Sequence, residues 1–408
     1  MNQGYLDFVI NGMEKMFDGV TDFGDRPYLL AASLSRFMNC DSLLDLSETF
    51  GINKSRLYKS ADSITPCRWL RRIIFRGRKR LLQLLKRWHM GDPSYKSRHP
   101  ITFAADDFTR SARGALGNWV GLFYSGAKKG VTTGINIEAL VAVIGDGDEV
   151  ILLDIRIVPP PAEQAGRPPL NHNEWLRRAL RNLHSWVLTN GSHFRGCPLS
   201  VDAAYISPAN VALVKDLGMI LVGKMSARRK VSGKIWGTVI APVNIFAGIS
   251  LILDCHRIGE LRGEEEVGFI RNKVWVESLH ASVLMVTFFN DEDALTYFST
   301  NLGMKTITLR NIIRYRWQLE RIFWILKQDI GIGDIHHHKE NRVEARIYLH
   351  FILAQILRDA SAVFGCSPKT VMRGIRRFPH FILHKLGFHS AFASSHSPES
   401  VLTVPLAA

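Results

Sequence analysis

The stretch YRWQLERIFWILKQDIG, residues 315–331, has the apolar spacing of a helix but carries three charged side chains within it. At roughly 100° per residue, a helix over residues 309–330 gathers one apolar stripe, which predicts its buried face: Ile312, Leu319, Phe323, Leu326 and Ile330. Arg316, Glu320 and Lys327 lie directly beside that stripe, with Trp317 beyond them. The pattern leaves two interpretations open: an Arg316–Glu320 pair on a solvated face, or charges that line a functional cleft.

Length and charge narrow the class of protein. A chain of 408 residues is too long for one ordinary core and indicates two or three domains. Its 52 Lys and Arg against 37 Asp and Glu give a formal net charge of +15, which suits a polyanionic partner such as nucleic acid. A membrane partner is disfavoured, because the longest apolar run, residues 238–253, is interrupted by Pro242 and Gly248 and favours strands.

The cysteines and the N-terminal residues indicate a cytosolic protein. Five cysteines are odd in number, widely spaced and without a CxxC pair, which favours free thiols over disulfides or a zinc site. The first 17 residues lack the positively charged start of a secretory signal. We therefore expect a cytoplasmic protein.

Residues 1–92 are predicted to form a helical domain that binds DNA. Two apolar segments around Gly51, within residues 43–62, have the spacing of a helix-turn-helix, although an ordinary helix pair shares it. The stretch that follows, residues 68–88, places many basic residues among leucines and isoleucines. Such density favours a phosphate-contacting surface over a merely solvated face. The candidate DNA contacts are Arg71, Arg72, Arg76, Arg78, Lys79 and Arg80.

A linker at residues 90–100 precedes a predicted α/β core over residues 98–225. Strands are expected at residues 101–105, 134–144 and 150–158, the last two joined by a Gly-Asp-Gly-Asp hairpin turn. Asn173 then caps a predicted helix up to Gly191, and a strand ending at Asp202, a second helix and a fifth strand follow. The order is β-β-β-α-β-α-β.

The remaining segments continue this pattern. Residues 226–302 favour strands throughout and predict a β-rich insertion subdomain. Residues 303–365 then contain the helix discussed first and a second long apolar helix over residues 344–364, while residues 366–408 are expected to form a loose tail.

Acidic residues stand where elements of this core end. Asp106 and Asp107 follow the first strand, Asp202 follows the fourth, and Glu320 lies on the helix after the insertion. A single Asp at a strand end is most often a turn former or a helix cap. Together, converging carboxylates repel one another unless cations lie between them, and Mg²⁺ is the natural occupant. Two such ions, roughly 3.5–4 Å apart, would support nuclease or strand-transfer chemistry at phosphorus.

These residues resemble the DDE transposases of bacterial cut-and-paste insertion sequences. The family signature Y-x2-R-x3-E-x6-K falls on Ile313, Arg316, Glu320 and Lys327, with Trp317 after the arginine; Ile313 departs from the tyrosine of the pattern. AADDFT, residues 104–109, is similar to the first-acid motif, and SVDAAY, residues 200–205, to the second. The resemblance extends over roughly residues 25–360.

The resemblance implies a ribonuclease-H-like α/β catalytic domain with a β-rich insertion. Asp202 and Glu320 would bind metal together with Asp106 or Asp107, the motif slightly favouring Asp107. The implied cofactor is Mg²⁺, as two ions for which Mn²⁺ can substitute. Arg316 and Lys327 would grip DNA phosphates, and Trp317 would pack beneath them.

The resemblance also implies an activity and partners. A bacterial, nucleoid-associated transposase would bind terminal inverted repeats, cut there and join the freed ends to target DNA, as a homodimer or larger assembly. Two alternatives stay open: a decayed or domesticated copy that binds DNA without cutting, and a structure-selective nuclease on the same fold. Gly223-Lys224 and Arg228-Arg229 are further candidate DNA contacts, and His336–His338 are expected to form a loop, not a metal site.

Overall fold

The structure is a computed structural model that divides into two compact units. It describes residues 3–17, 25–63, 65–111, 119–125, 130–159, 171–226, 229–235, 238–244, 259–261, 267–289, 294–332, 340–377 and 379–388. One unit, the helical unit, comprises Met1–Arg72, Ser111–Val120 and Ile322–Ala408; the other, the sheet unit, comprises Ile73–Arg110 and Gly121–Arg321. These bounds cut across the predicted domains, because residues 73–92 belong to the sheet unit and residues 322–408 share the helical unit with the N-terminal helices.

Five strands form the core of the sheet unit in the predicted sequence order. They are β1 (Ile101–Ser111), β3 (Gly130–Ile144), β4 (Glu149–Val158), β5 (Pro198–Val201) and β6 (Ile220–Lys224). β4 pairs antiparallel with β3, β3 neighbours β1, and β1, β5 and β6 follow in parallel. This arrangement is consistent with a ribonuclease-H-like fold. The short strand β2 (Gly121–Ser125), which pairs with the start of β3, was not predicted.

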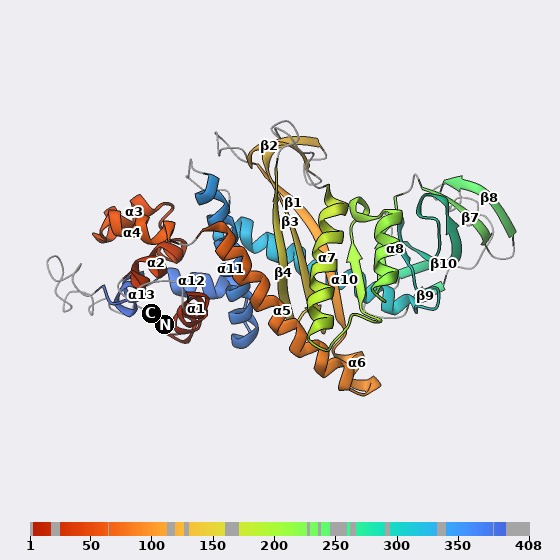
Figure 1. Ribbon diagram of the computed structural model, residues 1–408, viewed down its shortest axis with the longest axis horizontal. Coiled ribbons are helices and arrows are strands. Elements are labelled where there is room, and N and C mark those ends of the chain that lie inside the picture. Colours follow the sequence, from red (N-terminus) through yellow and green to blue (C-terminus); the bar gives the residue numbers. More distant parts are fainter. Residues whose placement is uncertain are drawn as a thin grey trace, which may run out of the picture. The chain divides into compact units, whose positions relative to one another are not determined.

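Helices cover both faces of this sheet (Figure 1). On one face, α7 (His172–Thr189) and α8 (Pro208–Asp216) join an apolar core with side chains of β1, β5 and β6. On the other, α10 (Thr306–Ile325) packs through Leu309 and Ile312 against Val222 of β6. α7 begins earlier than predicted, because Asn171 and Glu174 form a capping box and Asn173 lies inside the helix.

The predicted hairpin between the second and third core strands is present. β3 and β4 are joined by residues 145–148, where Gly145 and Gly147 have φ of 62° and 94°. These left-handed conformations favour glycine. A Cβ on Gly147 would also lie 2.4 Å from the Gln318 side-chain nitrogen of α10, so a larger residue there would displace that side chain.

One long basic helix, α5 (Pro66–Met90), runs from the helical unit into the sheet unit. Gly77 lets its backbone approach β4, since a Cβ there would lie only 2.0 Å from the Leu152 carbonyl oxygen. The predicted linker after it contains a short helix, α6 (Pro93–Arg98), which Asp92 caps by accepting from the Tyr95 amide at 2.7 Å.

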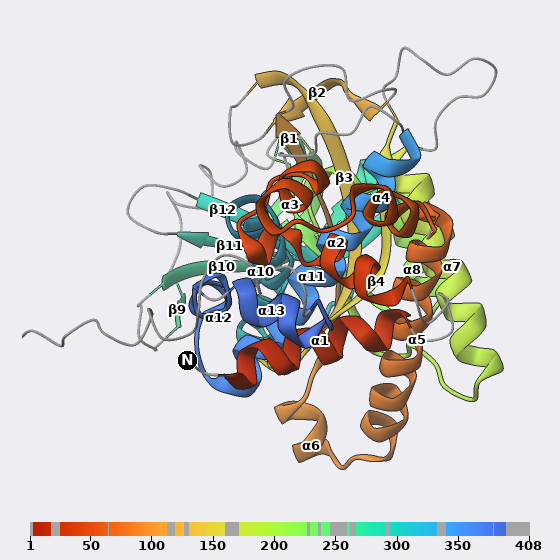
Figure 2. The same ribbon diagram turned by 90° about the vertical axis from the view of Figure 1, so that its left-hand side faces the viewer.

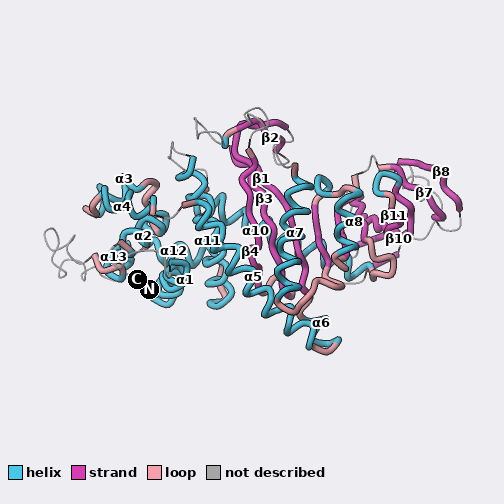
Figure 3. The backbone as a smooth tube through the Cα atoms, viewed as in Figure 1, coloured by secondary structure: helices cyan, strands magenta, loops and turns pink. Residues whose placement is uncertain are grey.

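The segment predicted as a β-rich insertion forms strands, but they extend the central sheet. They are β7 (Lys230–Ile235), β8 (Thr238–Asn244), β9 (Gly259–Leu261), β10 (Val267–Val276), β11 (Ala281–Phe289) and β12 (Ala294–Ser299). β12 pairs antiparallel with β6, opposing Ser299 to Val222, and β11, β10 and β7 follow. The strands therefore continue the sheet away from β1 (Figure 3).

The helical unit is built from the two ends of the chain (Figure 2). Its helices are α1 (Gln3–Phe17), α2 (Arg26–Ser33), η1 (Ser35–Met38), α3 (Leu43–Phe50), α4 (Lys54–Asp62), the π-helical segment η5 (Leu326–Ile330), α11 (Glu340–Phe364), α12 (Pro368–Arg376) and α13 (Pro379–Lys385). α3 and α4 form the predicted helix pair around Gly51. α12 and α13 occupy part of the expected loose tail, because Val371, Met372 and Ile375 give α12 a buried face.

α11 is long and apolar enough to cross a membrane by length and composition alone. However, 61% of its most apolar window is buried inside the protein. Core helices of soluble proteins pass the same test, so this helix is weak support for a membrane span.

Candidate active site

Asp106 and Asp202 lie side by side on the face of the sheet that α10 covers. Ala104 pairs with Ser200 across β1 and β5, and Ser200 pairs with Val222 of β6, which packs against α10. Because side chains alternate between the two faces of a strand, Asp106 and Asp202, each two residues further on, extend toward that same face. Neighbouring strands lie about 4.8 Å apart, so the two carboxylates come close to each other.

α10 brings Arg316 and Glu320 to the same place. The Arg316 guanidinium forms an ion pair with Asp106 and another, at 2.9 Å, with Glu320 one helical turn later. The side chains of Asp106, Arg316 and Glu320 are 11%, 17% and 36% exposed, so the cluster is half-buried at the edge of the sheet. The i,i+4 pair of the opening stretch is therefore present, but its arginine is largely buried and does not lie on a solvated face.

Burial and like charges perturb this cluster. Burial raises the pKa of Asp106 to about 7, with Asp107 and Asp202 adding to the rise and Arg316 opposing it. Burial lowers the pKa of Arg316, but the charges of Asp106, Glu320 and Asp202 outweigh it and raise the pKa overall. The Arg316 cation thus stands among three carboxylates, whose negative charge it offsets only in part.

Asp107 points to the opposite face. Its carboxylate accepts from the Asn136 amide at 2.7 Å, and the same nitrogen lies 3.0 Å from the Thr109 hydroxyl, two residues along β1. Burial raises the pKa of Asp107, and the hydrogen bond from Asn136 opposes that rise. Asp107 therefore belongs to a different polar cluster from the one around Arg316.

That second cluster surrounds Glu138 of β3, which is fully buried. Glu138 accepts from Arg156 of β4 at 2.6 Å and pairs with His172, the first residue of α7. The hydrogen bond to Glu138 raises the pKa of His172. Tyr205 lies close enough for the Glu138 and Asp107 charges to raise its pKa further than burial does alone. The cluster ties the start of α7 to the sheet directly behind Asp107.

Asp202 does not act as a helix cap, the ordinary role of an Asp at a strand end. It precedes the 3-10 turn η3 (Ala203–Tyr205), yet its side chain makes no capping hydrogen bond. Its carboxylate is left to face the site.

Tyr297 of β12 is a site residue that sequence reasoning missed. β12 places it opposite Lys224 of β6, on the α10 face. Burial raises its pKa, and Arg316, Asp202 and Glu320 all act on it electrostatically, which places it beside the site. No local sequence pattern indicates this role, because it depends on the pairing of β12 with β6, which a single sequence does not show.

The other predicted residues are spread more widely. Trp317 is 58% exposed and not packed beneath the charges, and Lys327 lies in the π-helical segment after α10. Arg229, a further candidate, donates to the Ile206 carbonyl at 2.7 Å and to Ser278. Arg228 and His336–His338 lie outside the described residues.

The basic residues of α5 divide into two groups. Arg71, Arg76 and Lys79 are exposed. Arg72 donates to the Met16 carbonyl at 2.5 Å, Arg80 makes a two-pronged ion pair with Glu149 at 2.6 and 2.7 Å, and Arg78 is partly buried near Asp154. The second group has structural partners within the protein.

The carboxylate cluster has the chemistry of a divalent-cation site. Its donors are all hard carboxylate oxygens, which suit Mg²⁺. In the described residues no three His, Cys, Asp or Glu side chains are close enough to hold an ion as they stand. Between Asp106 and Glu320 the positive charge comes from Arg316.

Comparison with known proteins points to one family. Residues 171–356, somewhat under half of the chain, match the protein family described as Transposase DDE domain. The family implies an enzyme that acts on DNA and typically uses divalent metal ions. No curated protein matches the sequence. Among solved structures, the NurA nuclease from Sulfolobus solfataricus is similar over 59% of this chain and 82% of its own, at 10% identity and a TM-score of 0.22. A likeness this slight carries no argument.

Proposed function

We propose that this protein is a transposase of an insertion sequence, which binds the terminal inverted repeats of its element, cuts there and joins the ends to target DNA. The observation that carries the proposal is the convergence of Asp106, Asp202 and Glu320 around Arg316, in a chain whose DDE domain match includes Asp202 and Glu320. The net charge of +15 suits the substrate.

Asp106, Asp202 and Glu320 are the proposed metal ligands. Asp106 is preferred to Asp107 because it shares a face with the other two, whereas Asp107 is engaged by Asn136 on the far side of the sheet. When bound, Mg²⁺ would activate a water or a 3′-hydroxyl and stabilise the leaving oxygen. Mn²⁺ would serve as a substitute.

Arg316 has two roles in this proposal. In the protein alone it supplies the positive charge that Asp106 and Glu320 need. With DNA bound, its planar guanidinium suits bidentate contact with a phosphate next to the scissile bond. Lys327 and exposed Trp317 would extend this contact along the strand. Bringing two DNA ends together would require a homodimer or a larger assembly.

The decisive test is cleavage of a labelled duplex that carries the element's own end sequence. Asp202→Ala and Glu320→Ala should each lower cleavage at least 1000-fold in Mg²⁺ or Mn²⁺ while DNA binding persists, because each removes a proposed ligand. Asp146→Ala is the matched control, since this carboxylate is 62% exposed and pairs with Arg314. It should cleave normally.

The same assay separates Asp106 from Asp107. Asp106→Asn should abolish cleavage, and Asp107→Asn should retain a measurable fraction, because only Asp106 lies on the face of α10. Binding without nicking by the unaltered protein would instead indicate a decayed copy, and cleavage that ignores the end sequence would indicate a nuclease.

A further inference from the structure

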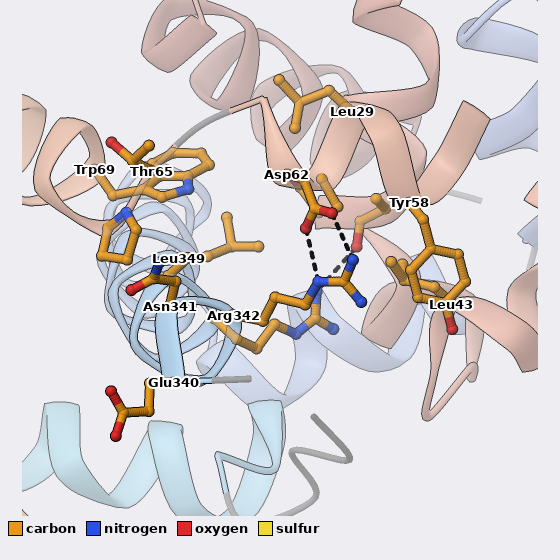
Figure 4. Close-up of a pocket in the computed structure, with 16 residues that line it drawn as sticks. Leu29, Leu43, Tyr58, Asp62, Thr65, Trp69, Glu340, Asn341, Arg342 and Leu349 are labelled. Atoms are coloured by element: carbon orange, nitrogen blue, oxygen red, sulfur yellow. Dashed lines mark hydrogen bonds and ion pairs between the residues drawn. The ribbon is translucent and has the colours of Figure 1, made fainter. Parts of the chain in front are cut away.

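The helical unit contains a pocket that the proposed chemistry does not use (Figure 4). Its volume is about 540 Å³, within the range of small-molecule sites. Residues of α2, α4, the start of α5 and the first turns of α11 line it. None of the three proposed metal ligands contributes to its wall.

A guanidinium that pairs with no carboxylate of the described residues lines this pocket. Arg346 donates to the Ala32 carbonyl at 2.9 Å and to the Ser35 hydroxyl at 2.8 Å, and within the part of the chain that the structure describes no carboxylate pairs with it. Burial lowers the pKa of Arg346 to about 10, and the charge of nearby Arg36 adds to the effect. A cation so placed is costly unless an anion compensates it.

The guanidinium is the donor that this pocket offers to an anion. Ser33 of α2 also lines the pocket, but it is 1% exposed and the protein covers its hydroxyl oxygen, so the hydroxyl does not reach a bound group. A guanidinium has five N–H donors, and the hydrogen bonds from Arg346 to Ala32 and Ser35 use only part of them. The remaining donors suit the oxygens of a bound anion.

The rest of the pocket wall contains aromatic side chains and an arginine–aspartate ion pair. Arg342 pairs with Asp62, with Nε to Oδ1 at 2.8 Å, and lies 5.3 Å from the centre of the Tyr58 ring. Trp69 also lines the pocket. Glu340 is six residues before Arg346 on α11, about 9 Å away along the helix axis. The acidic side chains of the wall are thus either paired or distant from Arg346. The Tyr58 and Trp69 rings and the Arg342 guanidinium are planar groups on which a nucleobase could stack.

We propose that this pocket binds a nucleoside 5′-monophosphate unit, with its phosphate on Arg346 and its base against Tyr58 and Arg342. The unit could be a free nucleotide or the 5′-phosphorylated end of a DNA strand, since both present the same chemistry. This binding is independent of the cleavage reaction, because it uses none of the proposed metal ligands.

The test is calorimetric titration of the full chain with deoxyadenosine 5′-monophosphate, inorganic phosphate and deoxyadenosine. The nucleotide should bind at least tenfold more tightly than either fragment. Arg346→Gln should weaken it at least tenfold, while Arg373→Gln, on the exposed face of α12, should not change it. Because Arg346 also supports α2, thermal melts must show that each variant folds; Ala345→Phe, which fills the pocket without removing a charge, is the second variant and should abolish binding.

Competition experiments then identify the source of the nucleotide. A 5′-phosphorylated single strand that displaces the nucleotide better than its 5′-hydroxyl counterpart would identify a DNA end, and equal weak displacement by both would identify a free nucleotide. The proposal is overturned if the wild-type chain binds no nucleotide at millimolar concentration, if inorganic phosphate binds equally well, or if all the pocket variants bind unchanged. Asp202→Ala and Glu320→Ala should bind the nucleotide as the wild type does, because neither residue lines the pocket. The cleavage assay tests the transposase proposal and the titration tests the nucleotide proposal, so either can fail without the other.

Discussion

Asp106 and Asp107 are adjacent in sequence but belong to different clusters. Asp106 pairs with Arg316 on one face of the sheet, and Asp107 accepts from Asn136 on the other. The strand alternation that separates them is simple, but it assigns a face only once the register of β1 against β5 is known. A motif that contains two acids therefore leaves the ligand undecided, and the packing of α10 distinguishes them.

The raised pKa of Asp106, about 7, predicts how stability depends on pH. An unfolded Asp loses its proton near pH 3.9, whereas the folded protein keeps it up to about pH 7. The free energy of unfolding should therefore fall as pH rises from about 4 to about 7, and level off above. Thermal melts of metal-free protein between pH 5 and pH 8 measure this, and Asp106→Asn should flatten the dependence.

Metal ions should reverse this trend, because Mg²⁺ needs the deprotonated carboxylate. The stabilisation by Mg²⁺ should be large at pH 8 and small at pH 5.5. Asp146→Asn, at an exposed position, should behave as the wild type. A Mg²⁺ effect that does not change with pH would contradict the place of Asp106 in the site.

At the scale of the element, one face of α10 is buried and stabilises the fold, and another face is exposed and carries the proposed DNA contact Trp317. The stripe expected to be buried is buried: Ile312, Leu319, Phe323, Leu326 and Ile330 are at most 5% exposed. Trp317 and Trp324 are half-exposed instead. Helix periodicity decides this division locally, without knowledge of the partner strands.

Neighbouring substitutions in α10 should therefore have opposite effects. Leu319→Ala should lower the free energy of unfolding by about 2–5 kcal/mol, because the side chain is fully buried. Trp317→Ala should change it by less than about 1 kcal/mol, as expected of an exposed position, but should weaken DNA binding. Denaturant titration and an anisotropy binding assay measure the two effects. Equal destabilisation by both would contradict the assigned faces.

Elements were predictable where their signals are local. The hairpin turn at residues 145–148, the α3–α4 pair and the alternation of strands and helices in the core follow from glycine positions, caps and periodicity. α12 was missed because its three buried side chains form a single short stripe, and the strands of the insertion could not be joined to β6 because strand pairing is non-local.

At the scale of the molecule, the net charge of +15 predicts DNA binding that weakens steeply with salt. The structure restricts which residues of α5 contribute. Arg71, Arg76 and Lys79 are exposed, while Arg80 is held by Glu149.

A triple variant of these exposed residues tests that division. Replacing Arg71, Arg76 and Lys79 by Gln should reduce the slope of log affinity against log salt by roughly 2–3, because each neutralised phosphate adds about 0.9 to that slope. Arg80→Gln should leave the slope unchanged. Anisotropy titrations of a labelled duplex at salt concentrations between about 50 and 200 mM would measure this slope, because protein–DNA affinity changes strongly over that range. An unchanged slope in the triple variant would rule out this face of α5.

The sequence by itself determined the class of this protein: an α/β core, acids at the ends of its strands, a charged amphipathic helix and a basic composition. Each of these signals is contained in a short segment of sequence, where spacing and residue type act directly. The tertiary structure decided that Asp106 faces Arg316, that Tyr297 joins the site and that Arg346 lines a pocket. Each of these depends on strand register or on helices packed from distant segments, and so each is set by long-range packing that no local pattern contains.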